Sequence, residues 1–169
     1  MPETTTNRPK FVYVTYIRST REKVFKALTD GDATRAYWFG YRIESEWTVG
    51  GPLRFYNPEG QLVHDDKLLA YDPPATLSYG WKPLQKGFEG ETESRVTFTL
   101  EQAGGQVKLT MVHDEMMPGG KMLDAVSGGW PAVISSLKSL LETGEPLVVQ
   151  MAPPEKMLAA LKRLGIKTP

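Results

Sequence analysis

One helical stripe near the C-terminus constrains the fold of this chain more than any other feature. From Trp130 onward, apolar residues recur at i, i+3, i+4, i+7, i+10 and i+11, which is the spacing of one face of an α-helix. Gly144 follows the stripe and predicts the end of the helix. A helix with one apolar face has to cover another layer of structure. The residues of the stripe are Trp130, Val133, Ile134, Leu137, Leu140 and Leu141.

The segment between Tyr41 and Asp114 supplies that layer. Its apolar residues alternate with polar ones, which is the period of half-buried strands, and glycine and proline turns separate the alternating runs. A helix that lies on a curved antiparallel sheet leaves a cavity between the two layers. We therefore expect function in that cavity. The expected strands cover residues 41–47, 53–56, 62–71, 76–81, 96–100 and 107–113.

The N-terminal part adds one more strand and two short helices. The β-branched and aromatic run from Phe11 to Ile17 predicts a first strand, with burial expected on both faces. Ser19 or Thr20 is expected to cap a first helix, and a second helical segment should run from Ala33 to Trp38. The order of elements is then strand, two short helices, six-stranded meander and long helix, with Pro118 to Ser127 leading into the long helix.

Composition narrows the function classes. The chain has 169 residues, enough for one domain with a sizeable core, and 20 basic residues balance 20 acidic ones. A balanced charge argues against nucleic acid or an anionic membrane surface as a partner. Cysteine is absent, which removes disulfides and thiolate zinc sites. The N-terminus resembles no secretory signal and no apolar run could insert into a membrane, so we expect a cytoplasmic protein.

Short motifs follow one another in a fixed order from about Phe11 to Gly144. They are Ile17, 20–30, 49–51, 72–77, 79–81, 96–100, 109–113 and 129–142. This ordered set resembles the SRPBCC, or START-like, superfamily, and within it the family named after the activator of the heat-shock-protein-90 ATPase. The resemblance implies an α+β helix-grip fold: a curved seven-stranded antiparallel sheet wrapped around a long C-terminal helix, with two short helices after the first strand. It implies less about chemistry, because the superfamily hosts lipid carriers, cyclases and co-chaperones.

Aromatic and methionine residues at strand spacing are the candidates for the wall of the cavity. Side chains of this kind either contact a ligand or simply fill the core. The hollow that the fold implies favours ligand contact for a part of them, and the methionines near the long helix would shape an adaptable opening. The predicted ligand-binding residues are Trp38, Phe39, Phe55, Tyr79, Trp81, Met111, His113, Met116, Trp130 and Val133.

His113 continues the inward series of its strand, so its polar ring needs a partner. That partner is either a neighbour such as Tyr79, in a structural role, or a bound ligand. Both histidines stand in acidic triplets, His64-Asp65-Asp66 and His113-Asp114-Glu115, but neither spacing is a recurring metal motif, so we predict no metal and no cofactor. No serine lies in a nucleophile elbow, and we assign no catalytic residue.

Three hypotheses for the function follow. The first is non-catalytic binding of a small, largely apolar molecule in the cavity; the second is a co-chaperone-like module that binds a chaperone; the third is a cyclase or hydrolase that uses His113 as general acid or base. We expect residues 10–145 to form the domain. We expect residues 146–169 to form an extension with a short amphipathic helix on Met157, Leu158, Leu161 and Leu164, which would cover its own chain or dock in a homodimer.

Overall fold

The computed structural model describes residues 8–84, 86–148 and 163–165. Most of the predicted C-terminal helix therefore lies outside the described residues. The elements are β1 (Phe11–Ile17), α1 (Arg21–Thr29), α2 (Gly31–Tyr37), β2 (Arg42–Ser45), β3 (Pro52–Tyr56), β4 (Leu62–Asp72), β5 (Thr76–Trp81), β6 (Ser94–Ala103), β7 (Gln106–Asp114) and α3 (Met122–Thr143).

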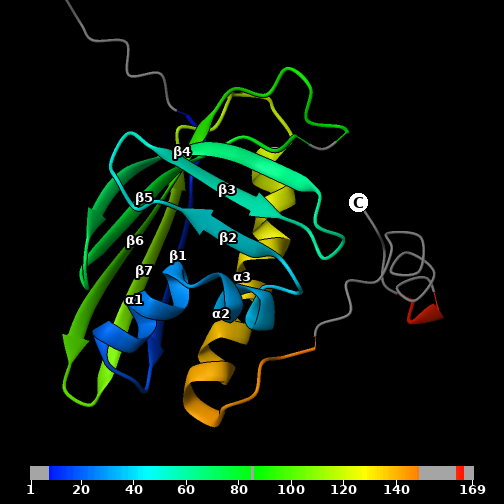
Figure 1. The fold of residues 1–169 in the computed structure, drawn as a ribbon. Coiled ribbons are helices and arrows are strands. Elements are labelled where there is room, and N and C mark those ends of the chain that lie inside the picture. Colours follow the sequence, from blue (N-terminus) through cyan, green and yellow to red (C-terminus); the bar gives the residue numbers. More distant parts are fainter. Residues whose placement is uncertain (1–7, 85, 149–162, 166–169) are drawn as a thin grey trace, which may run out of the picture.

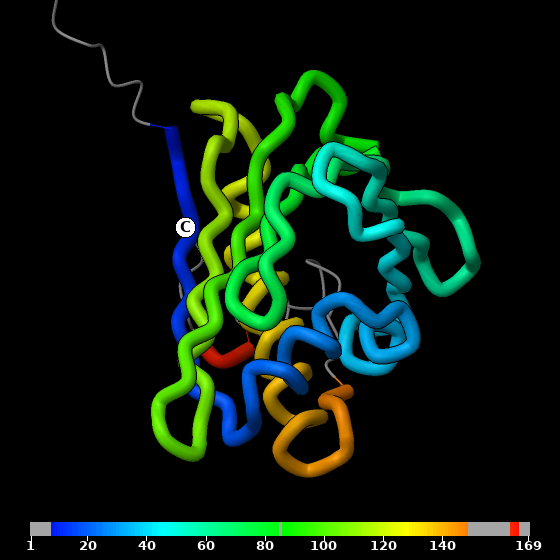
Figure 2. The backbone as a smooth tube through the Cα atoms, turned by 60° about the vertical axis from the view of Figure 1, so that its left-hand side comes forward, coloured from blue at the N-terminus to red at the C-terminus, as the bar shows by residue number. Residues whose placement is uncertain are grey.

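The seven strands form one antiparallel sheet in the order β1-β7-β6-β5-β4-β3-β2. Strands β2 to β7 are a meander in which each strand pairs with the next, and β1 joins the far edge by pairing with β7. The sheet curves, and α3 lies along its concave side with α1 and α2 near the end of the helix (Figures 1 and 2). The predicted α+β helix-grip fold is confirmed.

The long helix begins earlier than the sequence pattern indicated. It starts at Met122, so most of the segment expected to lead into it is already helical, and Pro131 lies inside the helix. Proline lacks the N–H that would bond to the carbonyl of Ser127, and Ser127 is exposed, so water can satisfy that carbonyl. The helix ends as predicted at Gly144, whose φ of 84° is left-handed.

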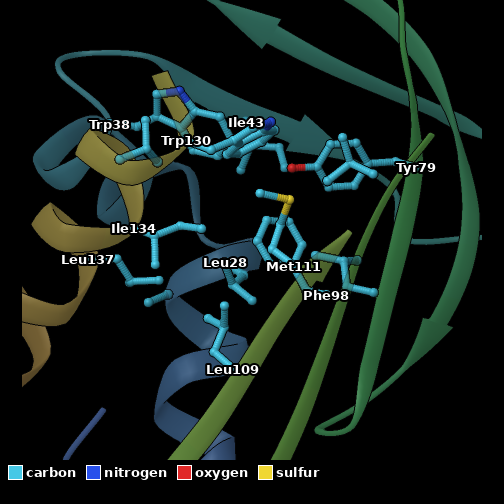
Figure 3. Close-up of a cluster of buried hydrophobic side chains, with 14 of the residues drawn as sticks. Leu28, Trp38, Ile43, Tyr79, Phe98, Leu109, Met111, Trp130, Ile134 and Leu137 are labelled. Carbon is cyan, nitrogen blue, oxygen red and sulfur yellow. The ribbon is translucent and has the colours of Figure 1, made fainter. Parts of the chain in front are cut away.

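The apolar stripe of α3 packs onto the sheet. Trp130, Val133, Ile134 and Leu137 are buried, whereas Leu141 is only partly buried because it lies near the end of the helix. Figure 3 shows Ile134 and Leu137 facing the same cluster as Phe98, Leu109 and Met111 of the sheet and Leu28 of α1. The hydrophobic effect of this single shared core joins the two layers.

Strand β1 differs from the sequence expectation. Its burial alternates, and Val12, Val14 and Tyr16 are close to half exposed. The prediction that both faces are buried is wrong because β1 is an edge strand, and among the described residues no helix covers the outer face of the sheet. Apolar residues on that face reflect β-propensity more than burial.

The short helices begin at side-chain caps. Thr20 accepts a hydrogen bond from the amide of Lys23 and caps α1, and Asp30 accepts bonds from the amides of Asp32 and Ala33 and caps α2. The second helix thus starts two residues before the predicted position. No helix in the described part of the chain is long and apolar enough to cross a membrane.

Candidate ligand pocket between the sheet and the long helix

A pocket of about 170 Å³ lies between the sheet and the first half of α3. One wall comes from α2 and strands β4 and β5, one from the loop that follows β5, and one from α3. Most of the wall is aromatic or aliphatic, which is the usual surface of a pocket for a small apolar molecule. The lining residues are Trp38, His64, Trp81, Pro83, Phe88, Met122, Ala125, Val126, Gly129, Trp130 and Val133.

The helix contributes a stripe of its own to the pocket. Met122, Val126, Trp130 and Val133 follow helical spacing, so they share one face of α3. Gly129 lies beside them on the pocket wall, and a Cβ atom built there would meet no atom within 4 Å. The missing side chain at Gly129 therefore leaves open space on the pocket wall.

Three tryptophans form the aromatic part of the wall. The ring of Trp130 lies 5.3 Å from that of Trp38 and 5.2 Å from that of Trp81, and the rings of Trp38 and Trp81 stack at 6.2 Å. They come from three different elements, the C-terminal cap of α2, β5 and α3. Figure 3 shows Trp38 and Trp130 side by side at one end of the core cluster. Contacts of this geometry stabilise the wall beyond the area they bury.

A chain of hydrogen bonds holds two of these tryptophans in place. The indole N–H of Trp130 donates to Nδ1 of His113 at 3.0 Å. The proton of the neutral imidazole is therefore on Nε2, which lies 2.7 Å from the Ser94 hydroxyl and donates to it. Ser94 in turn donates to the carbonyl of Trp81 at 2.9 Å. His113 thus links β5, β6, β7 and α3, and both its ring nitrogens are engaged.

His113 is fully buried, and this burial decides its protonation state. Removal from water lowers the pKa of His113 from 6.5 to about 4, with a smaller contribution from His64, while Asp114 opposes the shift. The ring is therefore neutral at neutral pH. His113 does not line the pocket, so it lacks the access to a ligand that a general acid or base needs. Its role is to position the side chain of Trp130.

The other histidine does reach the pocket. His64 and Asp66 share the inward face of β4 with Leu68, opposite the buried Phe55 and Leu53 of β3. The ring of His64 lies 4.0 Å from that of Trp81. Its Nδ1 is 3.4 Å from the Asp66 carboxylate, although the two atoms are not aligned for a hydrogen bond.

A backbone hydrogen bond fixes the carboxylate of Asp66. Its other oxygen accepts the amide N–H of Lys82 at 3.0 Å, at the start of the loop that carries Pro83 and Phe88. Burial raises the pKa of Asp66, while His64 and the Lys82 amide oppose that shift. His64 is thus the one ionisable side chain among the described lining residues, and Asp66 lies behind it.

Four of the ten predicted ligand-binding residues line the pocket: Trp38, Trp81, Trp130 and Val133. The other six lie elsewhere. Met111 and Met116 are buried in the core, and Phe39 packs partly buried against it. Of the methionines near the long helix, Met122 does line the pocket. His113 bonds to Ser94 and Trp130, so the suggested partner Tyr79 is not its partner. The six residues outside the pocket are Phe39, Phe55, Tyr79, Met111, His113 and Met116.

Seven lining residues are not among the ten predicted ligand-binding residues: His64, Pro83, Phe88, Met122, Ala125, Val126 and Gly129. Two signals were present in the pattern. His64 alternates with exposed Asp65 and so shares the parity of buried Leu68. Met122 and Val126 continue the helical stripe backward from Trp130, into the segment that was expected only to lead into the helix. Pro83 and Phe88 belong to a loop, where periodicity carries no information.

Neither acidic triplet gathers metal ligands. Within the described ranges, no group of three histidine, aspartate or glutamate side chains could hold a metal ion. The reason is strand alternation: His113 points into the core, while Asp114 points outward and pairs with Arg95 at 2.7 Å.

A second hollow, of about 480 Å³, lies near Arg35, Arg42 and Tyr56. Its wall is more polar, and Arg42 already pairs with Asp32 and Glu44. It lacks both the aromatic wall and the position between the layers, so the smaller pocket is the better candidate for a ligand.

A curved antiparallel sheet that grips a long C-terminal helix, with a pocket between them, defines a START-like, SRPBCC-type domain. Residues 18–142 match the family model described as Activator of Hsp90 ATPase homolog 1-like protein. The chain belongs to this family. No match was found among functionally curated proteins.

Solved structures support the same fold. Protein MLL2253 from Mesorhizobium loti is 26% identical with a TM-score of 0.68, and the match covers 79% of this chain and 96% of that one. The Aha1 dimer from Colwellia psychrerythraea is 21% identical with a TM-score of 0.64, covering 80% and 98%. CalU16 from Micromonospora echinospora is 20% identical with a TM-score of 0.66, covering 92% and 84%. The last two likenesses concern the fold alone.

Proposed function

We propose that this protein binds a small, largely apolar molecule, without catalysis, in the pocket between the sheet and α3. The observation that carries the proposal is the aromatic wall of Trp38, Trp81 and Trp130 around a space that Gly129 leaves open. An apolar cavity of about 150 Å³ is known to hold benzene, so a pocket of about 170 Å³ is suited to one ring with a small substituent. It is smaller than the usual pocket of a drug-sized ligand.

A variant that fills the pocket and keeps the fold tests this proposal. In Gly129→Leu, the new side chain would occupy the pocket, and helix propensity would rise. In the matched control Gly128→Leu, the new side chain adds the same propensity at an exposed position that does not line the pocket. We expect toluene to bind the parent and the control with Kd values within about threefold of each other, and not to bind Gly129→Leu.

Calorimetric titration and amide NMR shifts on α3 would measure this. Equal toluene binding by all three proteins, or binding by none, would contradict the proposal. Native mass spectrometry of the protein purified from its own host would then show whether an apolar compound copurifies.

A co-chaperone role is the second candidate, favoured by the family to which the chain belongs. It predicts that the purified protein raises the ATPase rate of the Hsp90-type chaperone from the same organism. The assay is steady-state ATP hydrolysis by that chaperone with and without the protein. Toluene binding and ATPase stimulation are independent readouts, so the two candidates are separable.

Self-association through residues 146–169 is a further proposal, supported by the dimer described for the Colwellia relative. Light scattering of the full chain and of a chain that ends at Val148 compares the two masses. A mass of two chains for both proteins would place the interface outside the extension.

A further inference from the structure

The pair of His64 and Asp66 constrains the chemistry of the ligand. His64 is 6% exposed and lines the pocket, so any molecule bound there meets an imidazole edge in a wall that is mostly aromatic and aliphatic. Its Nδ1 is completely buried and faces Asp66. Nε2 makes no hydrogen bond among the described residues and is not one of the completely buried polar atoms, so it can meet a molecule in the pocket.

The carboxylate behind the ring selects one tautomer. Asp66 accepts the Lys82 amide with one oxygen and turns the other toward Nδ1 of His64. A carboxylate can only accept hydrogen bonds, so an imidazole proton on Nδ1 is favoured by the oxygen that faces it at 3.4 Å. Nε2 then carries the free lone pair and acts as an acceptor.

The rest of the pocket wall argues against an anionic ligand. None of the lining residues is a lysine or an arginine, so a carboxylate in the pocket would have no cation to neutralise it beyond His64, which Asp66 already faces. Burial of an unpaired charge is costly. A neutral hydroxyl can donate to Nε2 and adds no charge.

Resting on the proposed function, we infer that the pocket selects a neutral single-ring molecule with a hydroxyl group, of the phenol class, whose O–H donates to Nε2 of His64. The apolar ring lies among the tryptophans, and the hydroxyl donates to a ring nitrogen that no described residue engages. Asp66 acts through His64 as a positioning residue.

The test compares p-cresol with toluene, which differ only by the hydroxyl. In the parent protein p-cresol should bind more tightly than toluene. His64→Phe keeps a ring of similar shape and removes both nitrogens, so the Kd of p-cresol should rise about tenfold, while that of toluene should change less than about threefold. Toluene thus reports whether the variant keeps its pocket.

Asp66→Asn gives a second, independent variant. Its oxygen can keep the Lys82 amide, and its NH₂ group then faces Nδ1, which moves the imidazole proton to Nε2. The preference should shift from p-cresol toward 4-methylanisole, which only accepts hydrogen bonds.

The outcomes separate the two proposals. If neither ring binds the parent, the proposed function fails. If toluene binds as tightly as p-cresol, or if His64→Phe weakens both equally, the pocket binds rings but the hydroxyl inference is overturned. Tightest binding of benzoate would also overturn it, in favour of an anionic ligand.

Discussion

Acidification should destabilise the folded protein through His113, by an amount that follows from its burial. The pKa of His113 is lowered from 6.5 to about 4 in the folded state, so between these values the unfolded chain binds the proton more readily. Stability is therefore fully present above pH 6.5 and is lost as pH falls toward 4. For one group, the free energy of unfolding should decrease by about 2 kcal/mol from pH 7.5 to pH 5.

The matched variant is His113→Gln. Glutamine does not titrate, yet its amide can accept from the Trp130 indole and donate to Ser94, as the imidazole does. Carboxylates and His64 are present in both proteins, so their contributions largely cancel in the difference. Urea denaturation at several pH values between 7.5 and 5 measures the free energy of unfolding of each protein.

The difference in stability between the parent and His113→Gln should thus shrink by about 2 kcal/mol as pH falls to 5. A difference that stays constant over this range would refute the reasoning, because His113 would then titrate alike in the folded and unfolded states. A parent protein that gains stability relative to the variant would show that the buried ring is charged. Either result would show that a neutral His113 does not hold Trp130 and Trp81 in place through Ser94.

Three further predictions concern stability, each measured by chemical denaturation. Leu137→Ala should cost about 2 to 5 kcal/mol because Leu137 is almost completely buried, and a loss below about 0.5 kcal/mol would contradict the assigned core face of α3. Glu91→Ala should lower the free energy of unfolding by about 1 kcal/mol and speed hydrogen exchange at the Lys121 amide, because the Glu91 carboxylate accepts a hydrogen bond from that amide at the start of α3. An unchanged rate of hydrogen exchange would contradict this capping role. Val14→Thr should change stability by less than about 0.5 kcal/mol, since Val14 is half exposed on the edge strand, and a larger loss would indicate that something covers that face.

The architecture could be predicted from the sequence because it depends on periodicity. The stripe from Trp130 to Leu141 and the alternation along the strands each fix which side chains share a face, and a one-faced helix beside half-buried strands has few ways to pack. Local rules predicted the helix end at Gly144 and limited the cap of α1 to Ser19 or Thr20, of which the structure has Thr20. The start of α3 was misplaced because the segment from Pro118 to Ser127 was expected only to lead into the helix, whereas the helix begins at Met122 and has Pro131 inside it.

The site depended on contacts that no local pattern contains. His113 and His64 both point inward from acidic triplets, yet His113 is closed off by Ser94 and Trp130, and His64 is left at the pocket. Alternation determines the face of a strand on which a residue lies, but the depth of a side chain under its neighbours depends on the register of β5, β6 and β7 against α3. That register is set by packing among residues far apart in the chain, so the sequence alone determined the layers and their inward faces, and only the tertiary structure decided which inward residues border empty space.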